Sequence, residues 1–138
     1  MIGRSQHTLP ALGLGLAEQF TSPGSPLDLH YIELGRQLGE AVQELLGEDG
    51  VLLYPSHPTP APHHTQPIVK TFNWSYTAIW NVLVLPVTQV PLGLGRAGLP
   101  LGVQVVAGRN MDRLGIAVAQ QAERMFGGWV PPSPALSQ

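Results

Sequence analysis

The chain has 138 residues, of which 43% are hydrophobic and 12% are charged, and its formal net charge is −2. This length is typical of a single domain, but the charged share is about half that of an ordinary soluble domain, so we expect a partner or a missing part of the protein to cover some of the surface. The seven basic residues are scattered, which argues against nucleic-acid binding, and the absence of cysteine excludes disulfides, thiolate metal sites and a cysteine nucleophile.

Two helices are predicted in the first third of the chain. A short amphipathic helix near the N-terminus ends at the turn residues "TSPGSP" (21–26). The second helix starts at Pro26, with Ser25 as its N-cap and Asp28 completing a capping arrangement, and it ends at Gly47. The apolar face predicted for it consists of Leu27, Tyr31, Leu34, Leu38, Val42 and Leu45.

A short buried strand is predicted at residues 51–54, before the proline-rich segment "PSHPTPAPHHTQP" (55–67). The prolines exclude a helix or a strand there, and a loop of this length in a compact domain is usually functional or disordered. His57, His63 and His64 could bind a metal ion, but no carboxylate is near them in the sequence. Solvated loop histidines are the alternative.

A helix is predicted over residues 72–85, with an apolar side formed by Trp74, Ala78, Ile79 and Val82. The aromatic side chains of this part of the chain and of its C-terminal end are Trp74, Tyr76, Trp80 and Trp129. We expect them to pack in the core. Beside the proline-rich loop they could also form the wall of an apolar pocket.

Two strands are predicted next, at residues 87–92 and 103–107, joined by a glycine-rich corner. In this corner Gly93, Gly95 and Gly98 have the spacing of a dinucleotide-binding loop. That motif requires a helix directly after the glycines and an acidic residue about 20 positions later, and the sequence offers neither. We therefore interpret the corner as part of a hairpin and not as a nucleotide site.

The last predicted helix begins at Asp112, which could cap it, and ends before Gly127. Its apolar face is predicted to contain Leu114, Ala117, Val118, Gln121, Ala122 and Met125. The Pro/Ser-rich tail at 130–138 is predicted to be flexible. Helices and strands alternate along the chain, which indicates an α/β fold with helices packed on a sheet.

The residues alone provide no complete active site. A Gly-x-Ser-x-Gly nucleophile turn is missing from the sequence, and Lys70 is the only lysine. Ser75 follows it by five residues and is a weak candidate for a Ser-Lys pair. The longest apolar run, residues 82–94, is too short and too interrupted to span a membrane.

Three segments carry a family resemblance: "DGVLLYPSHPTPAPHH" (49–64), "FNWSYTAIWNVLVLPVTQVPLGLGRAGLPLGVQVVAG" (72–108) and "DRLGIAVAQQAERMFGG" (112–128). They resemble the C-terminal part of amidase-signature hydrolases, most closely fatty-acid amide hydrolases of the second, membrane-anchored type. The most specific motif is "GLPLGVQ" (98–104). The resemblance implies that residues 1–129 are the C-terminal segment of an amidase-signature domain, with a mixed β-sheet flanked by helices and incomplete on its own.

The resemblance implies an amidase of the Ser-Ser-Lys type that needs no cofactor or metal. No residue of this chain matches the catalytic Ser-Ser-Lys positions, and Lys70 is not the family's lysine. Thr71, Trp74 and Ala78 match positions that line the acyl channel, and they are spaced to share one face of a helix.

The partners implied by the resemblance are a long-chain fatty-acid amide, the remainder of the amidase domain and a possible homodimer of the whole enzyme, without nucleic acid. The whole enzyme would be intracellular and associated with a membrane or lipid droplet through a part that this chain lacks. A non-catalytic lipid- or partner-binding protein derived from an amidase is the alternative function.

Overall fold

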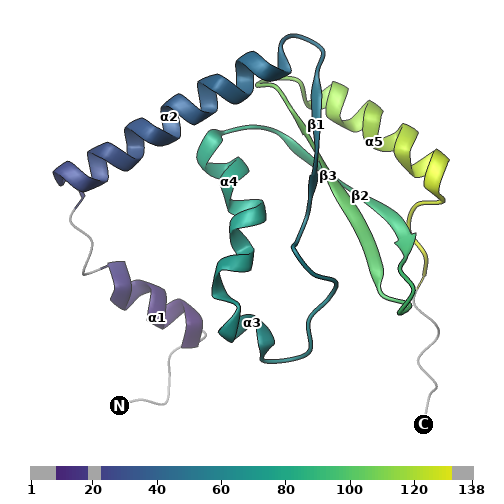
Figure 1. Ribbon diagram of the computed structural model, residues 1–138, viewed down its shortest axis with the longest axis horizontal. Coiled ribbons are helices and arrows are strands. Elements are labelled where there is room, and N and C mark those ends of the chain that lie inside the picture. The colour runs from purple at the N-terminus through teal and green to yellow at the C-terminus, as the bar shows by residue number, and fades with distance from the viewer. Residues whose placement is uncertain (1–8, 19–22, 132–138) are drawn as a thin grey trace. The chain divides into compact units, whose positions relative to one another are not determined.

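The computed structural model describes residues 9–18 and 23–131 (Figure 1). The chain divides into two compact units, Met1–Gly35 and Arg36–Gln138. The first contains helix α1 (Leu9–Glu18) and the start of helix α2 (Pro26–Leu46). The second contains the end of α2 and then β1 (Val51–Pro55), α3 (Gln66–Val69), the 3-10 helix η1 (Thr71–Trp74), α4 (Ser75–Leu83), β2 (Val87–Leu94), β3 (Pro100–Ala107) and α5 (Asp112–Phe126).

The predicted ends of α2 are confirmed. The backbone N–H of Asp28 donates to Oγ of Ser25 over 3.2 Å, and the carboxylate of Asp28 accepts from the N–H of Gly24 over 2.8 Å. A cap of this kind stabilises a helix by about 1 kcal/mol. At the other end Gly47 has a φ of 61°, and its N–H donates to the carbonyl of Gln43 over 3.0 Å. This left-handed conformation suits glycine, which has no Cβ to clash.

A three-stranded sheet in the order β1-β3-β2 organises the second unit. Both strand pairs are antiparallel, whereas the sequence predicts a mixed sheet. Helix α4 covers one face and helix α5 the other (Figure 1), so the expected α/β layering is present. None of the helices within residues 9–18 and 23–131 is long and apolar enough to cross a membrane.

Each face of the sheet has its own apolar core, because neighbouring residues of a strand point to opposite faces. Val106 and Val105 are consecutive in the central strand β3 and are both 0% exposed. The core under α4 contains Trp80, Leu83, Leu85 and Val106. The core under α5 contains Val90, Val105 and Ala119. The edge strand β1 is only half covered, since Leu53 is 59% exposed, although the sequence predicts a buried strand.

The glycine-rich corner is a β-hairpin, as predicted. The N–H of Gly95 donates to the carbonyl of Leu99 over 2.8 Å, and the N–H of Gly98 donates to the carbonyl of Gly95 over 2.9 Å. Gly98 has a φ of 71°, a conformation that glycine adopts at no steric cost. Strand β3 follows the corner directly, so no helix N-terminus is available to hold a phosphate there.

The predicted apolar side of the helix now seen as η1 and α4 is wrong in part. Val82 is 65% exposed and Trp74 is 60% exposed, while Trp80 and Leu83 are buried against the sheet. The end of α2 shows the same one-residue shift, because Leu46 is buried and the predicted Leu45 is 77% exposed.

Helix α5 approaches the sheet through small residues, which the predicted face omits. Gly115 and Ala119 are buried, whereas Met125 is 66% exposed. Small side chains at the contact allow close packing against the strands. Asp112 is the first residue of α5, and the preceding residue, Met111, is its N-cap, so the predicted cap is also wrong. Most of the tail predicted to be flexible, residues 132–138, lies outside the described residues, as does residue 20 of the first predicted helix.

The hairpin has no room for a side chain at Gly102. A Cβ there would meet Nε2 of Gln89 and would lie 2.7 Å from the carbonyl oxygen of Val90, which belongs to β2. The strand would have to shift, so we expect Gly102→Ala to lower the free energy of unfolding by about 1–3 kcal/mol. The measurement is the midpoint of thermal unfolding, with Gly13→Ala as control because a Cβ at Gly13 meets nothing within 4 Å. Equal midpoints for the two variants would contradict this expectation.

Candidate substrate-binding surface

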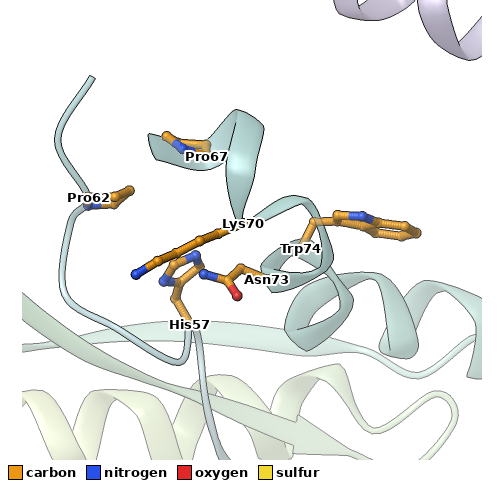
Figure 2. Close-up of a pocket in the computed structure, with 6 residues that line it drawn as sticks. All are labelled: His57, Pro62, Pro67, Lys70, Asn73 and Trp74. Carbon is orange, nitrogen blue, oxygen red and sulfur yellow. The ribbon is translucent and has the colours of Figure 1, made fainter. Parts of the chain in front are cut away.

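A pocket of about 350 Å³ lies between the proline-rich loop and the short helices α3 and η1 (Figure 2). Its volume is within the range of small-molecule sites, and its lining is mostly apolar. The loop contributes His57 and Pro62, and the helical side contributes Pro67, Lys70, Asn73 and Trp74. Figure 2 shows the side chains of Lys70 and Asn73 directed toward His57, while the indole of Trp74 points away from them.

The imidazole of His57 is held by its own loop. Nδ1 lies 2.8 Å from the carbonyl oxygen of Thr59 and 3.3 Å from the N–H of the same residue. A carbonyl oxygen only accepts, so the shorter contact is a hydrogen bond donated by Nδ1–H. Across residues 9–18 and 23–131, no three His, Cys, Asp or Glu side chains are grouped so that they could hold a metal ion. The metal-site hypothesis for His57, His63 and His64 therefore has no support from the described residues.

Ser75 and Lys70 do not form a Ser-Lys pair in this structure. The hydroxyl of Ser75 donates to the carbonyl oxygen of Phe72 over 2.7 Å, which is a local bond at the start of α4. Among the described residues no hydrogen bond joins Ser75 to Lys70, whose side chain lines the pocket. Without a base beside it, this hydroxyl is an ordinary weak nucleophile.

An apolar stripe, defined here as Trp74, Ala78 and Val82, runs along the side of η1 and α4 that faces away from the sheet. The three residues are four positions apart, so they lie one helical turn from each other on one side. Trp74 and Val82 are largely exposed, and Ala78 is half-buried. The structure thus places two of the three predicted channel residues on the same side. Thr71 is the first residue of η1, and its side chain lies outside the described part of the structure.

The sequence did not indicate which residue connects the pocket to the sheet. Gln104 is 4% exposed in β3, and its Nε2 donates to the carbonyl oxygens of Pro55 and Tyr76, each over 3.0 Å. The motif "GLPLGVQ" places Gln104 in the sheet, but these two contacts depend on tertiary structure. The one available signal was a polar residue within the run of valines at 103–106.

The family model described as Amidase matches residues 24–114, which include the "GLPLGVQ" motif. The chain belongs to the amidase family. It is 54% identical to fatty-acid amide hydrolase 2-A of Danio rerio over 132 residues, which are 95% of this chain and 24% of that protein. It is 47% identical to fatty-acid amide hydrolase 2 of Homo sapiens over 131 residues, 95% of this chain and 25% of that protein. The chain therefore spans about a quarter of the length of these relatives.

A solved structure has a similar fold. The glutamyl-tRNA(Gln) amidotransferase of Thermotoga maritima contains a polypeptide that superposes on this chain with a TM-score of 0.58 at 22% identity. The superposition covers 81% of this chain and 27% of that polypeptide. The amidase-family resemblance and the α/β fold class are confirmed by these matches.

Proposed function

We propose that this chain forms part of the sheet and one wall of the acyl channel in an amidase that hydrolyses long-chain fatty-acid amides to a fatty acid and an amine. The proposal draws its substrate class from the fatty-acid amide hydrolases, to which the chain is 47–54% identical. The observation that carries the role of the wall is the apolar stripe. An exposed Trp and an exposed Val on one side of a helix are suited to contact with an alkyl chain.

The dimensions of the stripe support an acyl chain as its ligand. From Trp74 to Val82 a helix rises about 12 Å, so a long alkyl chain can follow it over most of its length. Each methylene that leaves water contributes about 0.8 kcal/mol, and a short acyl chain would gain only part of this. The side chain of Ala78, in the middle, is small and leaves room for the ligand.

The open edges of the sheet support a place within a larger domain. In the described residues both β1 and β2 pair only with β3, so each has one edge without a partner. An unpaired edge is a surface on which further strands can add. About three quarters of the length of the relatives lies outside the match, and that portion would supply the neighbouring strands.

The chemistry in this proposal belongs to the part of the amidase outside this chain. There a Ser-Ser-Lys set would activate the nucleophile and form an acyl-enzyme, as the family resemblance implies. The residues of this chain would hold the acyl group in line with that nucleophile and exclude water from it. Lys70, His57 and Asn73 give the adjoining pocket a polar side next to its proline and tryptophan surface.

The test is a chimera in which this chain replaces the matching segment of the Danio rerio enzyme. Since volume-conserving changes cost less than about 1.5 kcal/mol, we expect kcat/KM for a long-chain fatty-acid amide to stay within about tenfold of the intact enzyme. The Danio rerio enzyme truncated before this segment is the control and should be inactive. A folded chimera that hydrolyses no fatty-acid amide, or a truncated enzyme with full activity, would contradict the proposal.

A further inference from the structure

One buried amide holds two segments together that the sequence separates. The Nε2 group of Gln104 has two protons, and it donates to two carbonyl oxygens, each 3.0 Å away. The carbonyl of Pro55 ends β1, where the proline-rich loop begins, and the carbonyl of Tyr76 lies in the first turn of α4. Because Gln104 is 4% exposed, water has little access to replace either bond.

Side chains on both sides of Gln104 reinforce this connection. Tyr54 and Gln89 are its neighbours in β1 and β2. The ring of Tyr54 lies 5.6 Å from the ring of Tyr76, and Oε1 of Gln89 accepts a hydrogen bond from Ser56 over 2.5 Å. A row of three residues across the sheet therefore fixes the beginning of the loop on one side and α4 on the other.

The two segments held by Gln104 carry the two walls of the pocket. Pro55 is two residues before His57, which lines the loop side, and Tyr76 is two residues after Trp74, which lines the helical side. With so few residues between the bonded carbonyls and the walls, a shift at either carbonyl moves the corresponding wall. The pocket therefore depends on a single side chain that is not part of its lining.

We propose that Gln104 is a positioning residue that sets the separation of the two pocket walls and, through Trp74, the acyl-chain length that the enzyme accepts. The effect on acyl length rests on the proposed function, whereas the effect on wall separation does not. Gln104 acts through the two carbonyls and does not itself contact the substrate.

Four variants separate this role from a general loss of stability. Gln104→Met removes both donors at nearly the same volume, and Gln104→Asn keeps an amide that is too short to reach both carbonyls. Gln89→Met releases Ser56 on the loop side only. Gln120→Met is the control, because Gln120 is exposed on α5.

The first measurement is the distance between spin labels on the two walls. The chain has no cysteine, so labels can be attached to cysteines introduced at the exposed positions Ala61 and Thr77. We expect Gln104→Met to shift and broaden the distance distribution, Gln89→Met to broaden it less, and Gln120→Met to leave it unchanged. If Gln104→Met does not fold, Gln104→Asn takes its place. A folded Gln104 variant with the unmodified distribution would overturn the proposal.

The second measurement compares long- and short-chain fatty-acid amides in the chimera with the Danio rerio enzyme. We expect Gln104→Met to lower the ratio of kcat/KM for the long to that for the short substrate about tenfold, mainly by raising KM for the long one. Mere destabilisation would reduce kcat for both equally and leave both KM values unchanged. That result would overturn the role of Gln104 in acyl length. If the unmodified chimera hydrolyses neither substrate, the proposed function fails, while the label distances still decide the role of Gln104 in positioning.

Discussion

Ala78→Trp is expected to lower kcat/KM of the chimera for a long-chain fatty-acid amide by about 100-fold, and for a short-chain amide by less than about threefold. Ala78 lies in the middle of the apolar stripe, between Trp74 and Val82. An indole at this point would fill the line that a long acyl chain follows. A short acyl chain that ends before Ala78 would not meet it.

The fold should tolerate this substitution. The sheet-facing side of α4 is formed by Trp80 and Leu83, and Ala78 points to the other side of the helix. Ala117→Trp is the matched control, since Ala117 is exposed on α5 and the chemical change is the same. Equal losses for long and short substrates in Ala78→Trp would show that the fold was damaged, and they would argue against a channel position.

The sequence predicted the order of the main elements because their ends carry local signals. Ser25 and Gly47 delimit α2 through side-chain and backbone bonds to residues at most four positions away. The hairpin could be predicted because Gly98 and its neighbours permit a tight turn between two valine-rich strands. Such signals act within one turn of chain, so they do not depend on tertiary contacts.

The helix faces were harder to predict because α4 has two apolar sides. Trp80 and Leu83 pack on the sheet, while Trp74 and Val82 are exposed. Periodicity detects both sides, but it does not say which of them the sheet covers. In α5 the contact is made by Ala119 and Gly115, which a search for large apolar residues passes over.

The pocket could not have been predicted from spacing. It forms because Gln104 bonds to carbonyls 49 and 28 positions away in the sequence. Thr71, Trp74 and Ala78 were selected through the family resemblance, and their role as channel residues stays a prediction.

The central claim is that this chain supplies structure and binding surface while the nucleophile belongs to the rest of the amidase. Acylation requires a serine with a base within about 3 Å and donors for the oxyanion. In this chain the hydroxyl of Ser75 is bonded to the carbonyl of Phe72, and the only lysine, Lys70, lines the pocket. We therefore expect the chain alone to hydrolyse no amide.

The most direct measurement is labelling with a fluorophosphonate probe when this chain is produced as a separate polypeptide together with the truncated Danio rerio enzyme that lacks the matching segment. The two polypeptides differ in size, so a gel shows which one carries the probe. The account predicts that the chain is unlabelled alone and in the mixture, and that its presence restores labelling and hydrolysis by the larger polypeptide. Stoichiometric labelling of the chain itself, abolished by Ser75→Ala or Lys70→Ala, would contradict it.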